Sequence, residues 1–217
     1  MSTLYFLGGP PRTGKSTIAA RFIARKPKPL IATDALIESI RKLFVDDSFP
    51  ILREIKISGY VKYKAPGTQE LTTKEFDDPP VHENTLALRA LLGTIAHYGR
   101  NNTDVIVEGC IFDPTWITRH TFAGFKVRVV FVGFTNDDHF DEIISHAKQN
   151  PSDWINHLLG NHNGDEAPVK ERLGAYIEQS KQLAHSAPAA GFSFVDMSGK
   201  SFRTFVDEVV AKLGEVG

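Results

Sequence analysis

The chain has 217 residues, of which 41% are hydrophobic and 24% are charged, fractions close to those of average globular proteins. This composition argues against general disorder and against a fibrous architecture, and the length suits one domain with room for an insertion. Lysine and arginine number 25 against 26 for aspartate and glutamate, so the formal net charge is -1. Such a balance disfavours a broad surface for nucleic acid, although it is compatible with a local basic pocket.

The sequence also bears on where the protein works. No apolar run approaches the roughly 20 residues that are needed to span a bilayer. The N-terminal apolar stretch 4–7 is too short for the core of a signal peptide. The single cysteine, Cys110, excludes an intrachain disulfide, which fits a reducing compartment. We therefore expect a cytoplasmic protein without a membrane partner.

Short apolar runs alternate with amphipathic stretches along the chain, a pattern that is typical of βα units around a mostly parallel sheet. We expect strands at 4–7, 30–32, 105–107, 126–134 and 192–195. We expect helices at 14–25, from 34 to about 44, and at 84–100, 138–148, 169–187 and 202–213. The sequence thus predicts a single α/β domain over residues 1–217, with about five parallel strands flanked by helices in three layers.

The alternation of predicted strands and helices is interrupted between residues 45 and 83, where apolar residues alternate only loosely and Pro66-Gly67 marks a turn. A small hairpin or an irregular cap, inserted into the domain, is the natural interpretation. Such a segment can be surface decoration, but long loops in compact domains are often binding elements.

Residues 9–16, Gly-Pro-Pro-Arg-Thr-Gly-Lys-Ser, satisfy the pattern G-x-x-x-x-G-K-[ST]. The pattern begins just after a predicted strand and its end opens a predicted helix, which is the context that a phosphate-binding loop requires. Backbone N–H groups at a helix start form a concave anion site, and the positive end of the helix dipole assists it. An accidental glycine-rich turn is the alternative. We expect this loop to bind a nucleoside triphosphate.

The residue types in the loop fit this chemistry. Gly14 lets the backbone approach a phosphate without a Cβ, and Lys15 can neutralise charge on the β and γ phosphates. The Ser16 hydroxyl can ligate Mg²⁺. Pro10 and Pro11 lack N–H donors, but they lie in the first half of the loop, where they should stiffen its entry. The predicted nucleotide-binding residues are Gly9, Arg12, Thr13, Gly14, Lys15, Ser16 and Thr17.

The loop alone does not separate kinases from switches, motors or transporters. Together with Thr33-Asp34, Val107-Glu108-Gly109 and the helix–strand run 172–197, it resembles the P-loop kinases of small acceptors. That group includes 2-phosphoglycerate kinase-like, zeta toxin-like and chloramphenicol phosphotransferase-like proteins, and shikimate and nucleoside monophosphate kinases. The resemblance covers most of the chain outside the insertion 45–83. It implies a three-layer P-loop NTPase fold, with ATP and Mg²⁺ as cofactors.

The resemblance also implies that Asp34 takes or orients the proton of the acceptor hydroxyl. Independently, ligands of open α/β sheets lie beyond the carboxyl ends of the strands, and Asp34 follows the second predicted strand there. Asp34 as a simple helix cap is the alternative. Arg41, two turns further along the same face, is a candidate for holding an acidic group of the acceptor, or else a solvated helix arginine. The family often carries a second arginine three residues after the acid, but that position is Ile37 here.

Two further residues are candidates for the transfer step. Glu108 ends the third predicted strand, where its carboxylate could hold a Mg²⁺-bound water; backbone N–H groups that satisfy it are the alternative. In the family a lid usually offers two arginines to the transferring phosphoryl group. The matching stretch here, 148–172, offers Lys148, Lys170 and Arg172, and lysine lacks the guanidinium fork. Arg172 is therefore the predicted lid residue, and Arg119, after the third predicted strand, is a second candidate.

These observations predict Mg²⁺-dependent transfer of the γ-phosphate of ATP to a hydroxyl of a small metabolite, with the insertion 45–83 covering the acceptor side. A polynucleotide 5′-hydroxyl kinase is the nearest alternative, but it would need a basic channel with stacking aromatics. A nucleotide-binding regulator or slow ATPase without a phosphoacceptor is a rival from a different class, and the arginine-poor lid favours it. The acceptor and the oligomeric state do not follow from the sequence.

Overall fold

The computed structural model describes residues 1–45, 83–150 and 153–214. The predicted insertion at 45–83 lies almost entirely outside these residues, so the hairpin or cap that we expect there stays a prediction. The side chain of Arg41 is also outside the described part, although its backbone belongs to a helix.

Five parallel strands form one sheet, in the order β2-β3-β1-β4-β5. Their bounds are β1 Ser2–Gly8, β2 Leu30–Ala32, β3 Val105–Gly109, β4 Phe125–Gly133 and β5 Ser193–Asp196. The first strand lies at the centre, paired with β3 on one side and β4 on the other. A central parallel strand is buried on both faces, which explains the continuous apolar run at its middle. The prediction of about five parallel strands is confirmed.

Eight helices occupy the described residues, and six of them match the predicted segments within a few residues. These six are α1 Lys15–Arg25, α2 Thr33–Val45, α3 Glu83–Arg100, α5 Phe140–Lys148, α7 Ala167–Ala189 and α8 Phe202–Gly214. Two short helices, α4 Pro114–Thr118 and α6 Trp154–Asn161, were not predicted. Within the described segments, no helix combines the length and the apolar character that a membrane crossing needs.

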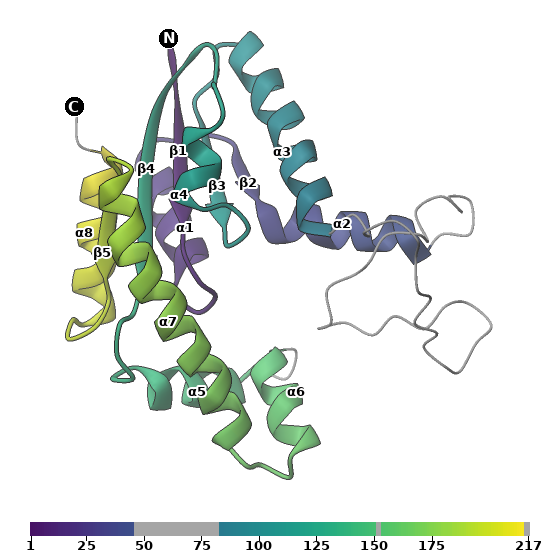
Figure 1. Cartoon of the computed structure of the whole chain (residues 1–217), viewed down its shortest axis with the longest axis vertical. Helices are drawn as coiled ribbons and strands as arrows, with labels where there is room; N and C mark the ends of the chain where they lie inside the picture. The colour runs from purple at the N-terminus through teal and green to yellow at the C-terminus, as the bar shows by residue number, and fades with distance from the viewer. Residues whose placement is uncertain (46–82, 151–152, 215–217) are drawn as a thin grey trace.

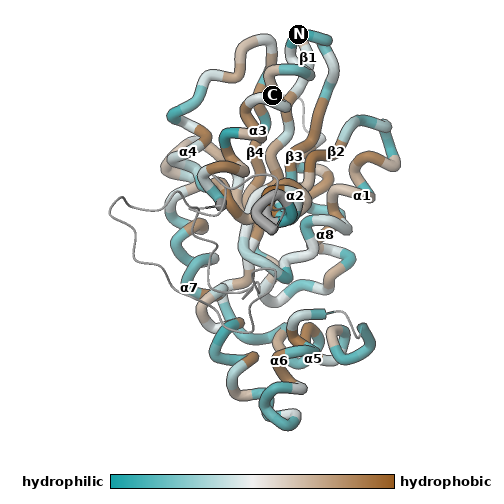
Figure 2. The backbone as a smooth tube through the Cα atoms, turned by 90° about the vertical axis from the view of Figure 1, so that its right-hand side faces the viewer, coloured by the Kyte–Doolittle hydropathy of each residue, from teal (hydrophilic) through white to brown (hydrophobic). Residues whose placement is uncertain are grey.

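Helices cover both faces of the sheet and give the predicted three layers (Figure 1). The side chains of β1 alternate between the faces, because successive residues of a strand point to opposite sides. Tyr5 and Leu7 pack with α1 and α8, whereas Leu4 and Phe6 pack with α3 and α4. Figure 2 shows the hydrophobic residues gathered along the strands, where these two cores meet the sheet.

Beyond the carboxyl ends of the strands, α5, α6 and the start of α7 form a small helical group (Figure 1). From this group, α7 runs back along the sheet and is fixed to the end of β4. The Ser180 hydroxyl on α7 accepts a hydrogen bond from Phe134 N at 3.1 Å and donates one to Tyr176 O at 2.8 Å. This anchor places the first half of α7 on the same side of the molecule as the loop that follows β1.

Candidate functional site

The loop from Gly9 to Gly14 joins the carboxyl end of β1 to α1, and its glycines are required by its path. Gly14 precedes the helix in a left-handed conformation, with a φ of 70°, which an L side chain rarely adopts. Gly9 has a φ of 144°, and a Cβ there would lie 2.2 Å from the carbonyl oxygen of Val132 on β4. The predicted strand–loop–helix context of the phosphate-binding motif is therefore confirmed.

Lys15 lies across this loop. Its side chain is buried, and Nζ donates a hydrogen bond to Pro10 O at 2.7 Å. The same carbonyl accepts a bond of 2.9 Å from the Thr13 hydroxyl. Burial lowers the pKa of Lys15, because an ammonium group loses hydration in the protein interior. Pro10, which we expected only to stiffen the loop entry, thus also holds the lysine in place.

Glu108 lies where three strands end together. It is in register with Leu7 of β1 and Ala32 of β2, and its side chain is buried. The Ser16 hydroxyl at the start of α1 donates a hydrogen bond to Glu108 Oε1 at 3.1 Å. Burial raises the pKa of Glu108, while the Lys15 charge and the Ser16 hydrogen bond act in the opposite direction.

These two oxygen-bearing side chains fit a magnesium ion. Mg²⁺ prefers hard oxygen ligands, and it usually binds through one or two carboxylates together with substrate phosphates and water. Ser16 and Glu108 supply one hydroxyl and one carboxylate at the same point. Among the described residues no group of three or more histidine, cysteine, aspartate or glutamate side chains could hold a metal ion by itself.

Asp34 lies in the first turn of α2, next to this pair. Its carboxylate is exposed, and Cys110 Sγ donates a hydrogen bond to Asp34 Oδ1 at 3.8 Å. Burial raises the pKa of Cys110 to about 11, and the negative charge of Asp34 adds to the effect, so the thiol keeps its proton. The Asp34 and Glu108 carboxylates both stabilise the charged form of Lys15. The predicted acceptor-side acid and the phosphate loop thus belong to one electrostatic cluster.

A close approach between β3 and α2 sets the position of Asp34. A Cβ on Gly109 would lie 1.7 Å from the Thr33 hydroxyl oxygen, so only glycine fits at this strand end. Thr33 itself is completely buried, and α2 begins there. This contact brings Asp34, which follows Thr33, close to Cys110, which follows Gly109.

Arg12 extends from the phosphate loop to the N-terminus of α6. Its Nη1 donates to Asp153 Oδ2 at 2.6 Å, and its Nη2 pairs with Asp153 Oδ1. The guanidinium also lies 5.4 Å from the centroid of the Trp154 ring. The same ring lies 4.8 Å from the guanidinium carbon of Arg172, the predicted lid arginine on α7. We call Arg12, Asp153, Trp154 and Arg172 the arginine clamp.

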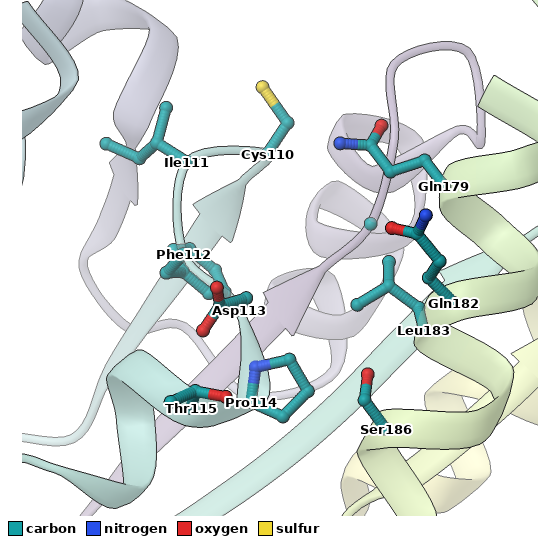
Figure 3. Close-up of a pocket in the computed structure, with 11 residues that line it drawn as sticks. Cys110, Ile111, Phe112, Asp113, Pro114, Thr115, Gln179, Gln182, Leu183 and Ser186 are labelled. Carbon is teal, nitrogen blue, oxygen red and sulfur yellow. The ribbon is translucent and has the colours of Figure 1, made fainter. Parts of the chain in front are cut away.

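A pocket of about 370 Å³ lies between the loop that follows β3 and the middle of α7 (Figure 3). Gly9 and Cys110 form part of its wall, so it adjoins both the phosphate loop and the thiol that contacts Asp34. The side chains of Gln179 and Gln182 project from α7 toward the loop in Figure 3. Its polar lining comes from Asp113, Thr115, Gln179, Gln182 and Ser186.

Solved structures with the same arrangement of strands and helices include several kinases. A gluconokinase from Sinorhizobium meliloti is 16% identical, with a TM-score of 0.52 and coverage of 98% of this chain and 91% of that chain. A shikimate kinase from Bacteroides thetaiotaomicron is 14% identical, with a TM-score of 0.52 and coverage of 98% and 99%. The chain has the P-loop kinase fold.

The structure of a tunicamycin resistance protein from Deinococcus radiodurans is also similar, with 14% identity, a TM-score of 0.50 and coverage of 100% of this chain and 98% of that chain. At these identities the likeness concerns the fold alone. No protein-family model and no curated protein matches the sequence.

Within this P-loop kinase fold, the predicted catalytic and metal-binding residues fall into two groups. Lys15, Ser16, Asp34 and Glu108 lie together at the carboxyl ends of the central strands. Arg172 lies apart from them and meets the phosphate loop through the arginine clamp.

Asp153 and Trp154 were missed by sequence reasoning. An aspartate directly before a short amphipathic segment is a helix N-cap signal, and it could have revealed α6. No local signal indicates that the same aspartate binds Arg12, because that contact joins segments far apart in the chain.

Proposed function

We propose that the protein is a P-loop kinase that transfers the γ-phosphate of ATP to a hydroxyl group of a small metabolite, with Mg²⁺ as cofactor. The observation that carries this proposal is the meeting of Lys15, Ser16 and Glu108 at the end of the loop 9–16. A buried lysine, a helix N-terminus and a hydroxyl–carboxylate pair are the parts that phosphoryl transfer needs for binding and charge neutralisation.

The phosphates of ATP would lie against the loop and the start of α1, where backbone N–H groups and the helix dipole favour anions. Lys15 would turn its ammonium group from Pro10 O toward the β and γ phosphates. Ser16 and Glu108 would hold the magnesium ion, directly or through water. When bound, this ion would neutralise charge on the phosphate oxygens.

The acceptor would bind on the side of Asp34, in the pocket between the loop after β3 and α7. Amide and hydroxyl groups such as those of Gln179, Gln182 and Thr115 both donate and accept hydrogen bonds, which matches a hydroxylated compound. Cys110 forms part of the pocket wall, and its thiol sulfur lies 3.8 Å from Asp34 Oδ1. Asp34 would orient the reacting hydroxyl or take its proton. Arg41 on α2 remains a proposed contact for an acidic group of the acceptor.

An assay of ADP release tests this proposal. The full-length protein is mixed with Mg·ATP and either a panel of hydroxylated metabolites or a DNA duplex with a 5′-hydroxyl end. We expect turnover with a small metabolite. Turnover only with the DNA end would indicate a polynucleotide kinase, and turnover that no acceptor increases would indicate a slow ATPase.

Asp34→Asn is the decisive variant, with Glu38→Gln on the same helix as its control. A general base contributes typically about 10²- to 10⁴-fold to a rate. We therefore expect Asp34→Asn to lower turnover by about 100-fold or more, with ATP affinity within about twofold of wild type. Unchanged turnover in Asp34→Asn would remove the acceptor role that we assign to this carboxylate.

A further inference from the structure

The arginine clamp brings two cations together on one aromatic ring. Arg12 comes from the phosphate loop and Arg172 from α7, and their guanidinium carbons lie 5.4 and 4.8 Å from the centroid of Trp154. Cations stack favourably on the face of an aromatic ring, and tryptophan is the best partner for this contact. The indole therefore offsets part of the repulsion between the two positive charges.

Asp153 fixes Arg12 within its own plane. Two parallel N–H···O bonds join the guanidinium to both carboxylate oxygens, and the side chains are 22% and 6% exposed. Bonds of this forked kind define the position of an arginine more sharply than a single contact does. The same carboxylate accepts a bond of 2.9 Å from Ile155 N and so caps α6. Asp153 therefore ties the Arg12 guanidinium group to the N-terminus of α6.

This arrangement leaves Arg12 able to bind an anion. A guanidinium group has five N–H donors, and the pair with Asp153 uses one on each terminal nitrogen. The pair with Asp153 therefore leaves three N–H donors of the group for another acceptor, such as a phosphate oxygen. Arg12 itself lies in the loop between Gly9 and Gly14, in a left-handed conformation with a φ of 69°, so its backbone belongs to the phosphate-binding turn.

We propose that Asp153 and Trp154 are positioning residues that hold Arg12 and Arg172 as a pair of guanidinium groups for the γ-phosphate of the bound nucleotide. This inference rests on the proposed function. One arginine of the pair comes from the loop itself and the other from α7. Two fixed cations stabilise the charge that spreads over the phosphoryl oxygens during transfer, and because they are already in place they need no reorganisation at that moment.

The proposal is tested by calorimetry, which requires no knowledge of the acceptor. The full-length protein is titrated with Mg·ADP and with the magnesium complex of adenylyl imidodiphosphate, an ATP analogue that is not hydrolysed. The ratio of the two affinities isolates the contribution of the γ-phosphate. Four variants are compared with wild type: Asp153→Asn, Trp154→Ala, Trp154→Phe and Asp165→Asn.

These variants separate positioning from folding. Asparagine is as good a helix cap as aspartate, so Asp153→Asn keeps α6 while it removes the charge and one acceptor for Arg12. Trp154→Phe keeps an aromatic ring at the position that both arginines contact. Asp165 accepts a bond of 3.0 Å from Ala167 N at the start of α7, so Asp165→Asn makes the same substitution at another helix start and serves as the control.

We expect wild type to bind the triphosphate analogue more tightly than ADP. Asp153→Asn and Trp154→Ala should lose about tenfold in affinity for the analogue, with ADP affinity within about twofold, because charge-assisted bonds to the γ-phosphate weaken. Trp154→Phe should keep most of the affinity for the analogue that Trp154→Ala loses. Asp165→Asn should bind both nucleotides as wild type does.

Two results would overturn the positioning role and leave the proposed kinase function in place. One is a set of variants that lose affinity for both nucleotides equally, and the other is a wild-type protein that binds the analogue and ADP with the same affinity. Binding of neither nucleotide by the wild-type protein would be a different result, because it would overturn the proposed kinase function.

Discussion

Arg12 and Asp153 are separated by 141 residues in the chain, yet two hydrogen bonds join their side chains. One residue belongs to the phosphate loop and the other caps α6, so the pair connects the loop to the helical group beyond the sheet. The Asp153 carboxylate is almost completely buried. A buried carboxylate without a partner is costly, which makes this contact important for stability as well as for the proposed chemistry.

A double-mutant cycle should detect this coupling. We expect both single variants to destabilise the fold: Arg12→Ala because it leaves the buried Asp153 carboxylate without its charged partner, and Asp153→Ala because it also removes a helix cap. The coupling energy between the two sites should be about 1–3 kcal/mol, as for other contacting charged pairs. Urea unfolding of the two single variants and the double variant measures it, and a coupling near zero would contradict the prediction.

Lys15→Met should abolish most phosphoryl transfer without unfolding the protein. Methionine can occupy the buried channel of the lysine stem, whereas the positive charge near the phosphates is lost. Loss of one group that stabilises transition-state charge typically lowers turnover by about 100-fold or more. Lys181→Met is the control, since Lys181 is an exposed lysine paired with Glu178 on α7. Equal turnover of Lys15→Met and wild type would refute the role of the loop.

Ser16→Ala and Glu108→Gln should each raise the magnesium concentration needed for half-maximal turnover. We expect a shift of about 10- to 100-fold, the range found when groups that support a metal are removed. Magnesium titration at saturating ATP measures it, and Glu178→Gln, on the surface of α7, provides the control. If both variants required the same magnesium concentration as wild type, the ion would bind elsewhere.

Gly109→Ala and Gly93→Ala should have opposite effects on stability. A Cβ at position 109 would lie 1.7 Å from the Thr33 hydroxyl oxygen, so the strand end or α2 must shift, and we expect a cost of about 1–3 kcal/mol. Gly93 lies within α3 with no atom near its Cβ position, and alanine there should stabilise the helix by about 0.5–1 kcal/mol. Thermal unfolding compares the two, and a neutral Gly109→Ala would show that the β3–α2 contact adapts easily.

Asp196, at the end of β5, should make stability depend on pH. Partial burial raises the pKa of Asp196, but hydrogen bonds from Thr135 and Ser198 outweigh this and lower it below the ordinary value. A lowered pKa in the folded state stabilises the fold above the unfolded-state pKa of about 3.9, and this stabilisation is lost as the pH falls through the folded-state pKa.

Asp196→Asn provides the measurement. The stability difference between wild type and this variant should be constant from pH 7 to about pH 5 and should shrink at lower pH, as the wild-type carboxylate becomes protonated. Thermal unfolding as a function of pH would show this. A difference that does not change with pH would mean that the hydrogen bonds to Asp196 do not favour its charged form.

Local sequence patterns were sufficient to predict the strands and the long helices. The run Leu4–Leu7 predicted a buried strand, and β1 is the central strand of the sheet, because both of its faces need apolar side chains. The loop 9–16 was also predictable, since its glycines and lysine act within a few residues of one another. Helices α4 and α6 escaped prediction because five and eight residues carry too little periodic signal to stand out.

The sequence by itself revealed the phosphate-binding motif and determined which segments become strands and long helices, because these properties depend on neighbouring residues. Only the tertiary structure decided which distant groups meet. Ser16 and Glu108 are 92 residues apart, and they touch because β1 and β3 pair in register and end together. Arg12 reaches Asp153 because α6 lies beyond the strand ends. Such meetings depend on how elements pack, and packing joins residues that no local pattern connects.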